Sequence, residues 1–278
     1  MTRLLTARTA AAPVALCRVM LGMAAFVRGL KTGRDLYYLQ FEPRAVPARL
    51  FDWAPEVATI PEMAILTGVW LAASIALIVG YRAQLAAFVV FLCAVFVHLV
   101  DMNFWAHHMY FLILMVLLIS FTESDAVWSV RWLRDDRPSR DVTAWPILLM
   151  KIQLSLVYFF TAVAKVNPVY LAGDVLSGRA TLPAFLADPP AIGMVAAATV
   201  AAEFFLSFAL WVRPLRMWGL FVGVVLHGLV PIAMGPYAGL VVFSLATLGV
   251  YVLFFDGRDA RGLAAWTNGR VPGMAGSS

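Results

Sequence analysis

Long uninterrupted apolar blocks constrain this sequence more than any other feature. They run for about 17–23 residues, and a helix of that length rises far enough, at about 1.5 Å per residue, to cross a hydrocarbon core about 30 Å thick. Of the 278 residues, 62% are hydrophobic and 13% are charged, whereas soluble domains carry about 25% charged residues. The sequence therefore excludes an ordinary soluble domain and predicts an all-α, polytopic transmembrane helix bundle.

Eight such blocks account for most of the chain. The expected spans are Ala11–Leu30, Pro61–Gly80, Gln84–Val100, His107–Phe121, Trp145–Lys165, Ala191–Val212, Met217–Met234 and Tyr237–Phe255. No long polar segment separates them, so we expect residues 1–278 to form a single membrane domain without a separate soluble domain.

The basic residues predict the orientation of these spans. With the amino terminus in the cytoplasm, twelve Lys and Arg residues fall in inner segments and five in outer loops, which follows the positive-inside rule. The remaining four lie within spans: Arg18, Arg28, Lys151 and Lys165. An even number of spans brings both termini to the cytoplasm, in agreement with the count of eight. We expect an integral protein of the bacterial inner or plasma membrane, whose net charge of +5 needs no nucleic-acid partner.

Ionisable side chains inside a bilayer are costly and usually have a partner or a function. In the expected topology Lys165 ends the fifth span on the outer side. All four histidines of the chain lie toward that side: His98, His107, His108 and His227. Asp101 and Asn103 fall in the same outer turn, where they can orient a neighbouring imidazole. An interfacial position or a helix-to-helix hydrogen bond would explain these histidines equally well.

Lys165 shares a helix face with Tyr158 and Thr161, because spacings of three, four and seven residues place side chains on one side of a helix. A lysine that is desolvated on such a polar stripe can be held neutral and act as a base. The residues alone leave two ordinary alternatives open. Lys165 can snorkel to the interface, and the stripe can serve interhelical hydrogen bonding.

Arg18 and Glu203 are two further ionisable residues inside spans, on the first and the sixth. An intramembrane ion pair would lower the cost of burying both charges, and we expect them to form it. No metal is expected, because the adjacent His107 and His108 point about 100° apart on a helix and cannot form a helical metal pair.

One segment is distinctive: QLSLVYFFTAVAKVNP at residues 153–168, followed by YLAG at 170–173. Three further segments match in order and spacing: ALCR at 15–18 with Gly22, HMY at 108–110 and LHG at 226–228. Together these segments span most of the chain and resemble the HTTM (horizontally transferred transmembrane) family, whose membrane domain is shared with vitamin K-dependent gamma-carboxylases.

The resemblance implies a chemistry. In the carboxylases, a lysine that matches Lys165 deprotonates reduced vitamin K. Oxygen then adds to the deprotonated vitamin, and a strong base forms. This base removes a proton from a glutamate side chain, and CO2 adds at the carbon that lost the proton. A histidine that matches His108 assists the carboxylation. The implied catalytic residues are thus Lys165 and His108, and the implied cofactors are reduced vitamin K or menaquinol with O2 and CO2.

Other polar groups of the same side are expected to support these two residues. They are His227, His107, Tyr158, Thr161, Asn103 and Asp101. Expected partners are membrane lipid, a quinone and a secreted or membrane-exposed peptide or protein.

We expect the chain to differ from true carboxylases in having no large extracytoplasmic domain, which in those enzymes binds the substrate propeptide. Two functions therefore stay open. One is a quinol-dependent enzyme that acts on an extracytoplasmic substrate, and the other is a non-catalytic membrane factor for maturation, export or immunity of a secreted peptide. A transporter is disfavoured, because the sequence has no detectable inverted repeat or paired broken helices.

Overall fold

The computed structural model describes residues 6–41, 59–100, 104, 106–134, 141–177, 183–188, 190–234 and 238–255. Its long helices are α2 (Ala11–Phe41), α3 (Ile60–Val79), α4 (Ala83–Val100), α5 (His107–Ile119), α6 (Trp145–Lys165), α10 (Ala191–Ala209), α11 (Arg213–Ala233) and α12 (Ala238–Tyr251). The shorter elements are α7 (Pro168–Leu171), α8 (Asp174–Ser177), α9 (Ala184–Ala187), the 3-10 turns η2 (Trp132–Arg134) and η3 (Val252–Phe254), and the strands β1 (Arg8–Ala10) and β2 (Asp141–Thr143).

Each of the eight expected spans overlaps one of the long helices, and the helix-bundle class is confirmed. Five helices are long and apolar enough to cross a membrane, namely α2, α3, α6, α10 and α11, whereas α4, α5 and α12 give shorter apolar helices. The structure therefore supports an integral membrane protein, while eight crossings and the orientation of the termini stay predictions.

The first helix continues well beyond its expected end at Leu30 and reaches Phe41. Lys31 and Asp35, four residues apart, form an ion pair with 2.5 Å between Nζ and Oδ2, and such pairs stabilise a helical turn. Polar residues that resemble a loop in the sequence thus prolong the helix. The short helices α7, α8 and α9 were not expected from the sequence either.

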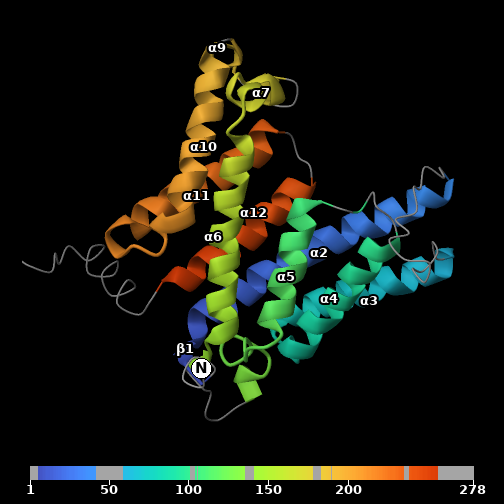
Figure 1. The fold of residues 1–278 in the computed structure, drawn as a ribbon. Coiled ribbons are helices and arrows are strands. Elements are labelled where there is room, and N and C mark those ends of the chain that lie inside the picture. Colours follow the sequence, from blue (N-terminus) through green and yellow to red (C-terminus); the bar gives the residue numbers. More distant parts are fainter. Residues whose placement is uncertain are drawn as a thin grey trace, which may run out of the picture.

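Helix α12 lies between two groups of helices (Figure 1). In the first group α2 packs against α3, α3 against α4, and α4 against α5; in the second α6 packs against α10, and α10 against α11. α12 contacts α2 and α5 on one side and α11 and α6 on the other. Helices α2 and α3 approach closely because Gly29 and Gly33 face Trp70 and Thr67, which leave little room for a Cβ atom.

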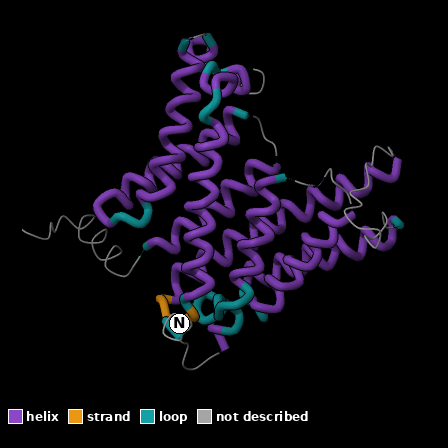
Figure 2. The backbone as a smooth tube through the Cα atoms, in the orientation of Figure 1, coloured by secondary structure: helices purple, strands orange, loops and turns teal. Residues whose placement is uncertain are grey.

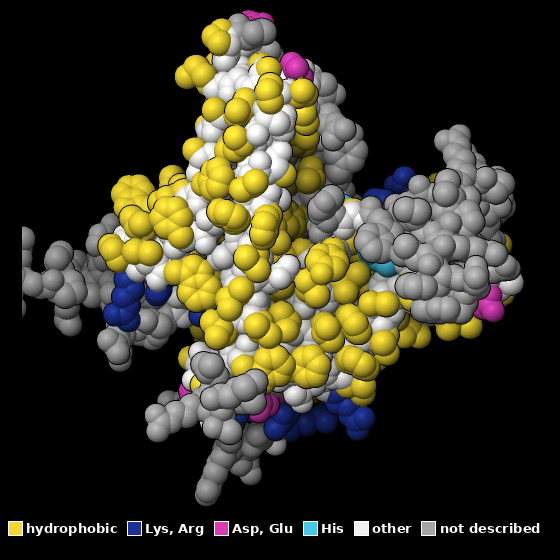
Figure 3. Space-filling model, in the orientation of Figure 1, with side chains coloured by type: hydrophobic (Ala, Val, Ile, Leu, Met, Phe, Trp, Pro, Cys, Tyr) yellow, Lys and Arg dark blue, Asp and Glu magenta, His cyan; other side chains and the backbone are white. Residues whose placement is uncertain are grey.

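The surface of the long helices is largely apolar. Hydrophobic side chains cover the face shown in Figure 3, and Lys and Arg gather mainly at its lower and left edges. Large side chains are exposed there or elsewhere on the bundle, with Phe160 at 62% and Phe221 at 63%. Extensive exposed apolar surface beside clustered cations is typical of a protein surrounded by lipid.

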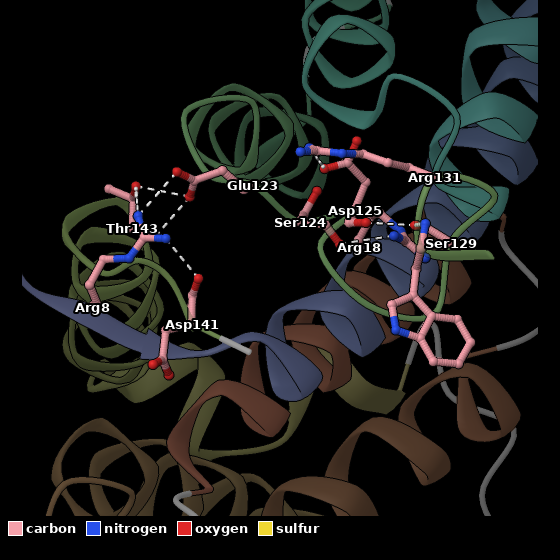
Figure 4. Close-up of polar contacts among 10 residues, drawn as sticks. Arg8, Arg18, Glu123, Ser124, Asp125, Ser129, Arg131, Asp141 and Thr143 are labelled. Atoms are coloured by element: carbon pink, nitrogen blue, oxygen red, sulfur yellow. Dashed lines mark hydrogen bonds and ion pairs between the residues drawn. The ribbon is translucent and has the colours of Figure 1, made fainter. Parts of the chain in front are cut away.

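The two strands lie beside the amino terminus at one end of the bundle (Figure 2). They pair antiparallel, with Arg8 opposite Thr143. Glu123 accepts hydrogen bonds from the backbone N and the Oγ1 of Thr143, both at 2.9 Å, and from Arg8 at 3.2 Å (Figure 4). Partial burial raises the pKa of Glu123, but these hydrogen bonds outweigh it and lower the pKa to about 2.

Arg18, on α2, connects this helix to the loop after α5 at the same end of the bundle. Its side chain is fully buried and donates to the carbonyl oxygens of Ser124 at 2.9 Å, Trp128 at 2.6 Å and Ile78 at 3.4 Å. Figure 4 shows the guanidinium beside Ser124, in the loop that follows α5. The expected ion pair between Arg18 and Glu203 is therefore wrong, because backbone carbonyls occupy both terminal nitrogens of Arg18 and Glu203 pairs with another residue.

Candidate functional site

Lys165 is the last residue of α6, at the end of this helix that is away from the strands (Figure 1). Its Nζ donates to Oε1 of Glu203 on α10 at 2.5 Å. The same Nζ lies 5.5 Å from the ring centroid of Tyr170 on α7. Asn167 begins α7 by accepting a hydrogen bond from the backbone N of Tyr170 at 2.9 Å, which holds that ring beside the lysine.

The ion pair is only partly shielded. The side chain of Lys165 is 28% exposed and that of Glu203 is 10% exposed. The second carboxylate oxygen of Glu203, Oε2, is buried and has no hydrogen-bond partner among the described residues. A buried carboxylate oxygen without a donor is costly, so Oε2 is available to a hydroxyl or N–H group of a ligand.

A second polar group links α6, α11 and α12. The hydroxyl of Tyr158 lies 2.6 Å from Nε2 of His227 and also forms a short hydrogen bond with the hydroxyl of Tyr251. All three side chains are buried. Gly223 makes room for this group, because a Cβ atom on Gly223 would overlap the ring of Tyr251.

This chain of hydrogen bonds has one open end. Nδ1 of His227 is buried and lacks a hydrogen-bond partner within the described parts of the chain. If Tyr158 donates to Nε2, then Nδ1 carries the proton and is a free donor; if Nε2 donates to Tyr158, then Nδ1 is a free acceptor. The two arrangements are the two tautomers of neutral His227, in which one ring nitrogen loses a proton and the other gains one, so the same residue can offer either a donor or an acceptor.

The ion pair and the hydrogen-bond chain are neighbours. Tyr158 precedes Lys165 by seven residues, about two turns of α6, so the two side chains lie on the same face of that helix. Helices α6, α10, α11 and α12 thus bring two charged and three neutral polar side chains together in an otherwise apolar bundle. Such a concentration of polar groups is typical of a functional site in a membrane protein.

Not all of the residues expected from the sequence take part. Thr161 bonds within its own helix, to the carbonyl oxygens of Val157 at 2.7 Å and Tyr158 at 3.1 Å. His108 lies against the start of α12, where its Nε2 would be 2.5 Å from a Cβ atom placed on Gly239. The contacts described above for Lys165 run instead to α10 and α7.

Three of the expected supporting residues cannot be placed. Asp101, Asn103 and the side chain of His107 lie outside the described residues. His98, the fourth histidine, is buried on α4, where its Nδ1 lies 2.8 Å from the carbonyl oxygen of Ala94.

Sequence reasoning missed two aromatic members of the site. Tyr251 completes the hydrogen-bond chain, and Tyr170 lies beside the lysine. A tyrosine inside an apolar span is the one signal that could have indicated Tyr251, because its hydroxyl needs a partner there. Glu203 was noticed as an intramembrane charge, but its neighbour could not be read from the sequence.

The site and nearly all of the described chain fall within one family match. The model of the HTTM domain matches residues 7–255. The chain belongs to the HTTM family. HTTM is a membrane domain of the vitamin K-dependent gamma-carboxylase family, and Lys165, Glu203, Tyr158, His227 and Tyr251 all lie in the matched region. No curated protein and no solved structure matches this HTTM protein.

Proposed function

We propose that this HTTM protein is a quinol-dependent membrane enzyme of the carboxylase type, acting on an extracytoplasmic substrate with Lys165 as its base. The observation that carries the proposal is the Lys165–Glu203 ion pair. The side chain of Lys165 is still partly exposed, and the Oε2 atom of Glu203 is unpartnered among the residues described. Ionisable groups inside membrane segments usually mark a functional site. Family membership supports the same assignment.

The hydrogen bond between the two residues lets the lysine lose its proton without a change in net charge. Transfer from Nζ to Oε1 converts an ammonium and a carboxylate into a neutral amine and a carboxylic acid. An apolar surrounding penalises the charged pair more than the neutral one. The neutral Nζ can then accept a proton from a hydroxyl of the bound substrate, while Glu203 keeps the first proton.

The residues present fit a reduced quinone. Such a group, when bound, supplies the hydroxyl to be deprotonated and the oxygen chemistry that generates a stronger base. Oε2 of Glu203 can accept a hydrogen bond from a hydroxyl, and Nδ1 of His227 can bond to a second polar atom. Phe159 and Phe160 on α6 are exposed, and they offer apolar surface toward the bilayer, from which a lipid quinone would enter.

Quinone epoxidation tests the proposal. The protein would be reconstituted in lipid nanodiscs with reduced vitamin K or menaquinol, oxygen, bicarbonate and a short glutamate-containing peptide, and the epoxide would be followed by chromatography. We expect epoxide from the wild type and none above background from Lys165→Ala. Lys151→Ala is the matched control, because Lys151 lies on the same helix four turns away, beside Phe254.

A folded wild type that yields no epoxide with either quinol, or a Lys165→Ala variant as active as the wild type, would contradict the proposal. A silent Lys165→Ala variant together with a peptide that co-purifies would instead support the non-catalytic membrane factor.

A further inference from the structure

Arg28, on α2, is a buried arginine that has no hydrogen-bond acceptor among the described residues. The residue is 4% exposed. Its Nε is fully enclosed without a partner among the described residues, and its side chain forms no hydrogen bond or ion pair with another described residue. Arg18 on the same helix is also buried, yet its two terminal nitrogens reach three carbonyl oxygens. One helix therefore carries one arginine supplied with acceptors and one without.

A guanidinium keeps its charge inside proteins and has five N–H donors to satisfy. Burying such a group without an acceptor is strongly unfavourable. Its Nε is one of the buried donors without a partner among the described residues, so the guanidinium has unused bonding capacity in the described structure. No described residue supplies the missing acceptor, and a bound anion could supply it.

The neighbours of Arg28 add to the same site. Thr32 lies one helical turn further along α2, is 2% exposed, and has an Oγ1 with no partner in the described chain. Asp35 is near enough for its negative charge to attract the guanidinium of Arg28. However, Oδ2 of Asp35 already accepts a hydrogen bond from Lys31 at 2.5 Å. His98 on α4 is close enough for the charge of Arg28 to act on it.

We propose that Arg28 and Thr32 form a binding site for a small oxyanion, such as a carboxylate, bicarbonate or a phosphate group. The planar guanidinium presents two parallel N–H groups that match two oxygens of one anion, and the Thr32 hydroxyl adds a third donor. Arg28 follows Arg18 by ten residues, about 15 Å along the helix axis, so the site is well separated from the end of α2 that lies beside the strands.

The proposal of a binding site rests on the buried, unpartnered atoms of Arg28 and Thr32. Only its use in carboxylation rests on the proposed function. A carboxylating enzyme must bind a carboxylate substrate and CO2 or bicarbonate. Arg28 is a residue of the membrane domain suited to hold such a group. The lipid bilayer offers a second source of the same chemistry, the phosphate of an anionic lipid.

Thermal unfolding in dodecyl maltoside micelles, which contain no phosphate, tests the site without quinol or oxygen. The probes are sodium bicarbonate, a blocked glutamate peptide and phosphatidylglycerol, each at constant ionic strength with chloride as reference. We expect a saturable rise in the unfolding temperature of the wild type. In Arg28→Gln the half-saturating concentration should rise at least tenfold, and in Thr32→Val it should rise severalfold. Arg34→Gln, an exposed arginine of the same helix, should respond as the wild type does.

The source of the anion follows from which probe acts. Stabilisation by bicarbonate or the peptide assigns a soluble carboxylate or carbonate, and stabilisation by phosphatidylglycerol alone assigns a lipid phosphate. Without any probe, Arg28→Gln should unfold at or above the temperature of the wild type, because an unpaired charge has been removed. Equal responses of wild type and Arg28→Gln, no response to any probe, or a strongly destabilised Arg28→Gln would each overturn the proposal. Lys165→Ala should keep the anion response, so a failed epoxidation assay and a failed binding assay are separate results.

Discussion

The two ends of the bundle treat buried polar groups differently. At the end beside the strands, both terminal nitrogens of Arg18 donate to backbone carbonyls, and the atoms left without a partner among the described residues are Arg18 Nε and Ser124 Oγ. Toward the other end, the Lys165–Glu203 pair and the Tyr158–His227 contact leave Oε2 and Nδ1 without partners in the described structure. The chain therefore satisfies its own charges where they hold loops in place, and leaves bonding capacity where a ligand would bind.

Replacing Arg18 should show the largest effect of this difference. In Arg18→Met the carbonyl oxygens of Ser124, Trp128 and Ile78 lose their donors inside the protein, so we expect a loss of at least about 3 kcal/mol in the free energy of unfolding. Titration with a denaturing detergent would measure it. Arg34→Met, on an exposed position of the same helix, should stay within about 0.5 kcal/mol of the wild type. Similar values for both variants would remove the contrast between the two ends.

Glu203→Gln should have the reverse profile, with a large loss of activity and a small loss of stability. The amide keeps the shape of the side chain but cannot take the lysine proton. We expect epoxide formation to fall about 100-fold, the lower range for acid–base groups, or about 2.7 kcal/mol in activation free energy. The unfolding temperature of the variant serves as the control. A variant as active as the wild type would leave Glu203 a purely structural partner.

Tyr158→Phe sharpens the comparison within one helix. The change leaves His227 and Tyr251 buried without their shared partner, and we expect it to destabilise the protein by about 1–2 kcal/mol. Thr161→Val removes a hydroxyl that bonds to its own helix, and should cost less than about 0.5 kcal/mol. Detergent denaturation of both variants side by side would show whether the interhelical contact is the stronger one.

Glu123 gives the smallest expected effect, and it depends on pH. Its pKa falls from 4.5 to about 2 on folding, so its contribution is present above about pH 4.5 and is lost as the pH falls toward 2. The side chain is 36% exposed, which limits the contribution to at most about 1 kcal/mol. Unfolding temperatures of wild type and Glu123→Gln should differ at pH 7, and the difference should shrink as the pH falls from about 4.5 to 2. A difference in unfolding temperature that is unchanged at pH 3 would contradict this prediction. Asp174→Asn is the control, and an equal difference for that variant would also show that Glu123 is not the cause.

Much of the fold could be predicted because each long helix corresponds to one continuous apolar block of the sequence. The segment of α6 from Trp145 to Lys165 was placed with both bounds correct. Errors arose where the chain is polar. Lys31 and Asp35 continue α2 through an ion pair, and α7 begins at an Asn167 cap, neither of which changes the hydropathy pattern.

The site was harder to predict, because helix neighbours are set by packing rather than by sequence distance. Lys165 and Glu203 are 38 residues apart, and Tyr158 and Tyr251 are 93 apart. The sequence pointed to the intramembrane charges one by one, but charge alone could not decide whether Glu203 would face Arg18 or Lys165. The contacts of α10 with α6 made that choice.

The anchoring of Arg18 also has a consequence for biogenesis. Its acceptors at Ser124 and Trp128 are 106 and 110 residues further along the chain. At a synthesis rate of about 5–20 residues per second, the ribosome needs on the order of 5–20 s to make them after Arg18 has emerged. During that interval the first helix carries a charge that it cannot yet satisfy, so its final position in the membrane should depend on the fourth apolar block and the loop that follows it.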